Sequence, residues 1–109
     1  MLWDPKKDKP VETKLDAVGL LMYRAADYLE THKWGQNHLL SDNGAVCSVG
    51  SLYKMESNDP RGGGSCPLTH LAKKRMVDYL GTSPAFWNDR PKRAKSEVIA
   101  ALREAAKLK

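Results

Sequence analysis

The sequence predicts a mostly α-helical fold, a compact single domain of three or four helices. Three stretches repeat apolar residues at spacings of three and four, the period of an amphipathic helix. Segments rich in glycine, proline and asparagine separate them, and these residues end regular structure. At 109 residues, 41% hydrophobic and 28% charged, the chain has the composition of one globular domain. We expect this domain over residues 13–109, after a flexible N-terminal arm at residues 1–12.

The first helix is predicted over about residues 14–32. Thr13 resembles an N-cap, and Asp16 follows three residues later as the acidic partner of a capping box. The apolar stripe that identifies the helix consists of Leu15, Val18, Leu21, Met22, Ala25, Tyr28 and Leu29. This stripe predicts the face of the helix that packs on the core.

The segment 45–55 fits two structures. Val46, Val49 and Tyr53 have helical spacing, and Gly50 would allow another element to pack closely, so we favour a helix. The turn sequence Asn43-Gly44 instead suits a short β-hairpin around residues 38–49.

The next helix is predicted to begin at Pro67 and to stop at Gly81. The glycines at 62–64 mark the preceding segment as a loop, because consecutive glycines lose too much entropy in a regular element. Proline is tolerated in a first helical turn, and either Ser65 or Cys66 is the expected cap. Its predicted inward residues are Leu68, Leu71, Ala72, Met76, Tyr79 and Leu80.

The last helix is predicted from about Ala94 onward, after an ordered loop at residues 82–91. Its expected inward residues are Val98, Ile99, Leu102, Ala105 and Leu108. In the loop, we expect Phe86 and Trp87 to be buried against the helices. We expect Asp89 to cap the last helix, although Asn88 and Asp89 at the edge of a pocket are the functional alternative.

The basic charge of the chain lies at its C-terminal end. Residues 90–109 hold seven lysines and arginines against two glutamates, which equals the net charge of +5 of the whole chain. On a helical wheel Lys92, Arg103 and Lys107 cluster opposite the apolar stripe, with Arg93 beside them. Such a ridge would suit a phosphate backbone or an acidic protein, and a solvated helix face is the simpler interpretation.

Neither a catalytic residue nor a metal or cofactor is predicted. Cys47, Cys66 and His70, with His38, are weak candidates for a zinc site, because no Cys-x-x-Cys pair is present. Cys66 at a helix start, with His70 as base, is a weak candidate nucleophile. We expect no membrane span and no signal peptide, and therefore a cytoplasmic protein with reduced cysteines.

Several segments together resemble a known family. These are Leu21-Met-Tyr-Arg-Ala-Ala-Asp-Tyr-Leu, Trp34-x-Gln36, Asn43-Gly-Ala-Val-Cys47-x-x-Gly50, Trp87-Asn-Asp-Arg-Pro91 and the helix from Glu97 to Ala106. Over about residues 15–106 the chain resembles a family of small proteins of unknown function from actinobacteria and their bacteriophages. The resemblance implies such an origin and no particular activity. The glycines at 62–64 and the arm depart from it.

The function expected from these observations is that of a small non-catalytic accessory protein that binds a host protein. The candidate partner-binding residues are Phe86, Trp87, Asn88, Asp89, Arg90, Lys92, Arg93, Arg103 and Lys107. Nucleic-acid binding through the basic C-terminal helix is one alternative, and a small metal- or thiol-dependent enzyme is another. Self-association through the apolar stripes is compatible with each of them.

Overall fold

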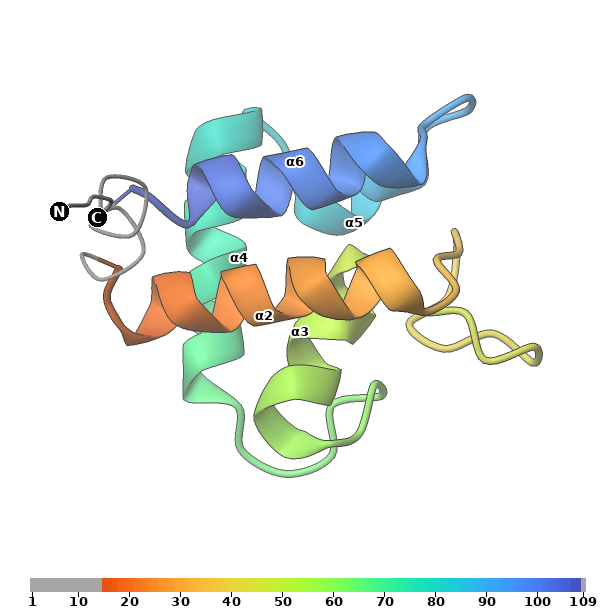
Figure 1. Cartoon of the computed structure of the whole chain (residues 1–109), viewed down its shortest axis with the longest axis horizontal. Helices are drawn as coiled ribbons and strands as arrows, with labels where there is room; N and C mark the ends of the chain where they lie inside the picture. Colours follow the sequence, from red (N-terminus) through yellow and green to blue (C-terminus); the bar gives the residue numbers. More distant parts are fainter. Residues whose placement is uncertain (1–14, 109) are drawn as a thin grey trace, which may run out of the picture.

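The fold is mostly α-helical, as predicted. The computed structural model describes residues 15–108, and the expected arm at residues 1–12 and the expected cap Thr13 lie outside them. These residues form five helices, α2 (Ala17–Thr31), α3 (Ser48–Ser57), α4 (Pro67–Leu80), α5 (Pro84–Asn88) and α6 (Lys95–Ala105) (Figure 1). No helix within this part of the chain has both the length and the apolar character needed to cross a membrane.

Helices α2 and α6 lie side by side and antiparallel, and α4 crosses behind them (Figure 1). The pairing is tight at both ends. Lys95 at the start of α6 contacts His32 after α2, and Gly19 near the start of α2 faces the carbonyl oxygen of Ala106. A Cβ on Gly19 would lie 2.6 Å from that oxygen, so only glycine allows this approach.

The core lies between α2, α3, α4 and α6. Its fully buried large side chains include Met22 and Leu29 of α2, Met76 of α4 and Leu102 of α6. These belong to the predicted apolar stripes, which the structure confirms in their central residues. The expectation was wrong for Leu71 and Tyr79 of α4 and for Leu108, which follows α6, because all three are exposed.

The cap of α2 differs from the predicted capping box. Asp16 is itself the N-cap residue, and its carboxylate accepts a hydrogen bond of 2.9 Å from the N–H of Gly19. The same carboxylate pairs with the guanidinium of Arg75 on α4. Asp16 therefore ties the start of α2 to α4 as well as capping it.

Both structures predicted for residues 45–55 are present in part. Helix α3 begins at Ser48, and just before it Val46 forms isolated β-bridges with Trp34 and Leu40. A full hairpin does not develop, because the chain turns into the helix at Cys47, directly after the bridges.

Of two other predictions about helix ends, one is confirmed and one is wrong. Helix α4 has Pro67 in its first turn and ends at Gly81 with a φ of 79°, as predicted. Helix α6 begins at Lys95 with Ala94 as its N-cap, so the prediction that Asp89 caps it was wrong. Asp89 is the C-cap residue of α5, a short helix within the segment that was expected to be a loop.

Candidate functional site

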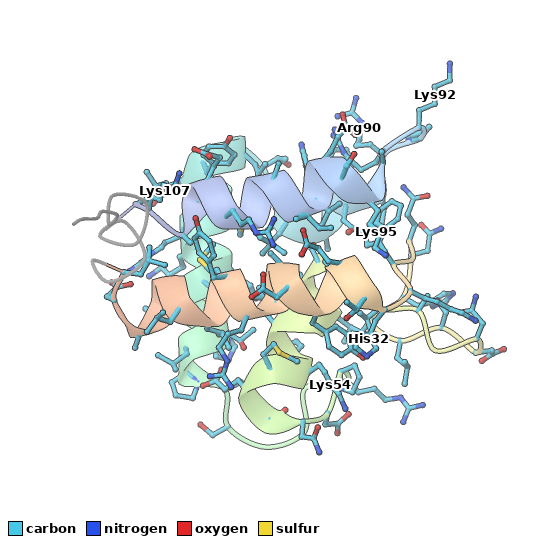
Figure 2. All side chains as sticks on the ribbon, viewed as in Figure 1. His32, Lys54, Arg90, Lys92, Lys95 and Lys107 are labelled. Carbon is cyan, nitrogen blue, oxygen red and sulfur yellow. The ribbon has the colours of Figure 1, made fainter. Side chains whose placement is uncertain are left out.

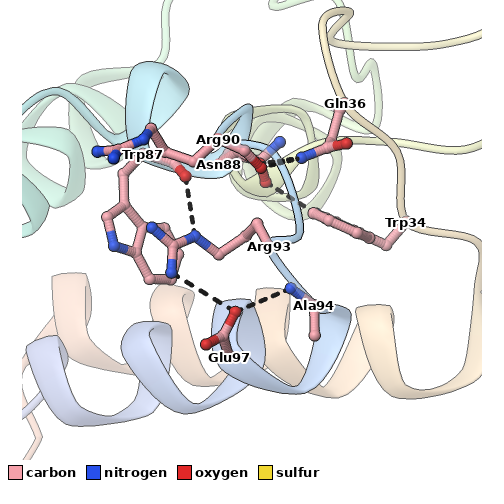
Figure 3. A network of polar contacts seen from close by, with 8 residues as sticks. All are labelled: Trp34, Gln36, Trp87, Asn88, Arg90, Arg93, Ala94 and Glu97. Carbon is pink, nitrogen blue, oxygen red and sulfur yellow. Dashed lines mark hydrogen bonds and ion pairs between the residues drawn. The ribbon is translucent and has the colours of Figure 1, made fainter.

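Asn88, at the end of α5, joins two segments that are far apart in the sequence (Figure 3). Its buried side-chain oxygen accepts hydrogen bonds from the indole N–H of Trp34, at 2.8 Å, and the backbone N–H of Ser48, at 3.0 Å. Its amide nitrogen donates to the carbonyl of Gly35, at 3.1 Å, and to the carboxylate of Asp89, at 2.9 Å. All four hydrogen-bonding positions of the amide are thus occupied, which gives Asn88 a structural role.

Gln36 and Asp89 complete this connection. The Gln36 amide donates to the carbonyl oxygens of Asn88, at 2.9 Å, and of Arg90, at 2.8 Å. The Asp89 carboxylate accepts from the backbone N–H of Asn37 at 2.8 Å. We call Trp34, Gln36, Asn88 and Asp89 the Asn88 network. It holds the loop after α2 against the end of α5.

Trp87 and Arg93 form a further set of contacts, which connects α5 to the start of α6. The Arg93 guanidinium lies 3.8 Å from the centre of the Trp87 ring, and its Nε donates to the Trp87 carbonyl at 3.0 Å. It also approaches the carboxylate of Glu97 at 3.5 Å. That carboxylate accepts from the N–H of Ala94 at 2.9 Å, which caps α6 (Figure 3). The two residues are engaged within the fold, so neither is a free contact group.

The hydroxyl of Ser48 is buried beside the Asn88 network and has no hydrogen-bond partner among residues 15–108. Ser48→Ala removes an unpaired polar atom at nearly constant volume. We therefore expect a free energy of unfolding within about 0.5 kcal/mol of the wild-type value, or above it. Ser51→Ala is the control, because the Ser51 hydroxyl donates to the Ser48 carbonyl at 2.6 Å and its loss should cost about 1 kcal/mol. Urea denaturation measures both, and a larger loss in Ser48→Ala would contradict the expectation.

Phe86, expected to be buried, is 59% exposed. Its neighbour Trp87 takes the inward direction on α5, and consecutive side chains of a helix point to different sides. The Arg90 guanidinium lies 5.7 Å from the centre of the Phe86 ring. Lys92 is exposed in the connection between α5 and α6, where its φ is 68°. We call Phe86, Arg90 and Lys92 the Phe86–Arg90 surface. Figure 2 shows Arg90 and Lys92 on one half of the molecule.

The predicted basic ridge does not exist as drawn on the helical wheel. Lys92 precedes α6. Arg103 forms ion pairs with Asp27, at 2.8 Å, and with Glu30, at 3.0 Å, and these contacts raise the pKa of Arg103. Lys107 lies 3.3 Å from Glu104. A helical wheel represents one helix alone, so it could not show that Asp27 and Glu30 of α2 lie beside Arg103 of α6.

The cysteines and histidines are not gathered into one site. The Cys47 thiol caps α3 by accepting from the N–H of Gly50 at 3.3 Å, and burial raises its pKa. Cys66 is buried before α4, and His70 is exposed on that helix. Among residues 15–108 no three His, Cys, Asp or Glu side chains come together as metal ligands would. A raised pKa keeps the Cys47 sulfur protonated near neutral pH and hence a poor nucleophile.

Asn88 and Asp89 were predicted as candidate site residues, whereas their hydrogen-bond partners were not. Trp34 and Gln36 had appeared only as part of the family resemblance, and Ser48 not at all. The available signal was that Trp34-x-Gln36 and Trp87-Asn-Asp both belonged to that resemblance. Two polar and aromatic motifs of one family, without obvious chemistry of their own, are natural candidates for contact.

Comparison with known proteins gives a family and no closer relative. No curated protein matches the chain, and neither does any solved structure. The model of one protein family, a family of unknown function, matches residues 14–108. The match includes every residue of the Asn88 network and of the Phe86–Arg90 surface. Because it covers most of the sequence, the chain belongs to the family of unknown function DUF6197.

Proposed function

We propose that this protein is a non-catalytic accessory protein that binds a protein partner through the Phe86–Arg90 surface. The observation behind the proposal is an aromatic ring exposed to solvent with a guanidinium above it. Aromatic residues, phenylalanine among them, and arginine are enriched in protein interfaces, and arginine is among the residues that most often dominate the binding energy. Burying the Phe86 ring in a partner would also desolvate the contact between Phe86 and Arg90, which strengthens it.

The Asn88 network supports this proposal by holding the surface in place. The backbone carbonyl of Arg90 is bound by Gln36, and Asn88 at the end of α5 is fixed by four hydrogen bonds. Side chains on a rigid base lose less entropy when they bind, so more of the contact energy appears as affinity.

The family resemblance supports a source in actinobacteria or their phages, and we propose a cytoplasmic host protein as the partner. The nucleic-acid alternative has less support, because Arg103 and Lys107 are paired with carboxylates. A thiol enzyme has less support as well, because the Cys47 thiol is buried and has a raised pKa.

Affinity capture from an actinobacterial lysate at physiological salt tests this proposal. We expect the wild-type protein to retain a specific protein, and Phe86→Ala/Arg90→Ala to retain about tenfold less of it, as hot-spot losses predict. The matched control, Tyr79→Ala/Lys74→Ala, removes an exposed aromatic residue and an exposed base from α4 and should leave recovery unchanged. Recovery of no protein, or equal recovery by both double variants, would contradict the proposal.

A further inference from the structure

An open depression of about 540 Å³ lies between the end of α2 and the start of α6. Its wall consists of residues 30–33, the turn residue Gly44 and Lys95. A Cβ on Gly44 would meet no atom within 4 Å, so the rim is open at this turn. The depression lies at the same end as Arg90 and Lys92; Figure 2 labels Lys95 and His32 at that end.

Two ammonium groups are held at this depression by backbone oxygens. The Lys95 ammonium donates to the carbonyl of His32 at 2.7 Å, and the Lys33 ammonium donates to the carbonyl of Asn43 at 3.4 Å. Carbonyl oxygens position an ammonium without cancelling its charge. Both cations are therefore placed and still available to an anion.

The negative charge at this depression is smaller than the positive charge of the two lysines. Glu30 is the acidic residue of the wall, and its carboxylate is bound at 3.0 Å by Arg103, which lowers the pKa of Glu30. The C-terminal end of α2 contributes about half a negative charge. The Lys95 ammonium lies directly on a carbonyl oxygen at that end. The two lysines against Glu30 leave the wall with a formal charge of +1, and Arg103 adds nothing to it, because Arg103 is also paired with Asp27.

We propose that this depression binds an acidic segment of the protein partner, with its carboxylates beside Lys33 and Lys95. The inference deepens the proposed function and rests on it, since it specifies what the partner brings to this end of the molecule. Charge complementarity selects an acidic segment, and Arg90 and Lys92 are two further bases on the same half of the molecule (Figure 2).

A nucleic-acid strand fits the depression less well than an acidic peptide. Single-stranded nucleic acids are bound by rows of cations together with exposed aromatic rings on which the bases stack. The wall of the depression holds two lysines and one glutamate, and the imidazole of His32, its aromatic ring, is already stacked on Tyr28 with the ring centres 3.9 Å apart. An acidic peptide needs only a few well-placed cations.

The test uses fluorescein-labelled oligoglutamate as the probe and fluorescence anisotropy at low salt. We expect Lys33→Gln/Lys95→Gln to weaken binding about tenfold. The control Lys73→Gln/Lys74→Gln removes the same charge from α4 and should change the affinity by less than about twofold. In the wild-type protein, the amide NMR signals of Gly44 and Lys95 should shift on addition of the peptide, which tests the site without any substitution.

Equal losses in the two double variants, or unchanged Gly44 and Lys95 signals, would overturn the inference. So would tighter binding of an oligothymidylate of equal length at the same residues, because the site would then belong to a nucleic acid. The two proposals fail separately. Lysate capture that depends on Phe86 without peptide binding at Lys33 removes only the acidic subsite. Peptide binding without any captured protein removes the proposed function, and with it the assignment of the acidic segment to a protein partner.

Discussion

Asn88→Ala is expected to lower the free energy of unfolding by about 3 kcal/mol or more, because it leaves one buried and two part-buried polar groups without partners. The Trp34 indole N–H and the Ser48 backbone N–H lose their acceptor, and the Gly35 carbonyl loses a donor. Each buried group left unpaired costs about 1–3 kcal/mol. In a domain of this size the loss corresponds to a fall in Tm of roughly 12 °C or more.

Asn43→Ala is the matched control for Asn88→Ala. Asn43 is exposed, and its side chain accepts one hydrogen bond, from the N–H of Ala45 at 3.0 Å. Its removal should cost about 1 kcal/mol or less. If Asn88→Ala fails to fold, Trp34→Phe removes a single donor of the same network and should still cost about 1 kcal/mol. Thermal and urea denaturation giving equal stabilities for the two asparagine variants would refute the structural role of Asn88.

Gly50→Ala is expected to destabilise the fold by about 2 kcal/mol or more, because the side of α3 at Gly50 lies against the backbone of Leu39. A Cβ on Gly50 overlaps the carbonyl oxygen of Leu39 and lies 3.1 Å from its carbonyl carbon. Alanine has a higher helix propensity than glycine by about 1 kcal/mol, so propensity alone predicts stabilisation. The steric conflict involves backbone, which yields little, and it therefore decides the sign.

Gly44→Ala is the control for Gly50→Ala, because it introduces backbone strain without a steric conflict. Gly44 has a φ of 88°, but a Cβ there meets open space, so only the strain of about 1 kcal/mol applies. Denaturation of both variants should rank Gly50→Ala as clearly less stable. The reverse order would mean that α3 and the segment at Leu39 can separate at little cost.

The elements that repeat apolar residues over several turns were predictable from the sequence. Helices α2, α4 and α6 follow their stripes, and Gly50 was expected to allow close packing, which the Leu39 contact confirms. Helix α5 was missed because five residues are too few to show a period, although Ser83 before Pro84 is a typical helix start.

The candidate site was harder to predict, because its contacts connect residues 40 to 54 positions apart. No local pattern specifies that Asn88 will meet Trp34, and the identity of Arg103 does not reveal the acidic residues of α2 beside it. The simpler interpretation of the basic residues at the C-terminal end was a helix face exposed to solvent. Arg103 is instead paired across the interface between two helices.

The antiparallel pairing of α2 and α6 has a practical consequence for experiments that attach the protein to something else. Residues at the start of α2 and at the end of α6 share one pole of the molecule, where Gly19 faces Ala106. In Figure 2 Lys92 projects at the opposite end, and Arg90 lies on the same half of the molecule. A tether attached directly at residue 15 or at residue 108 would therefore leave the labelled bases of the Phe86–Arg90 surface on the side away from the attachment.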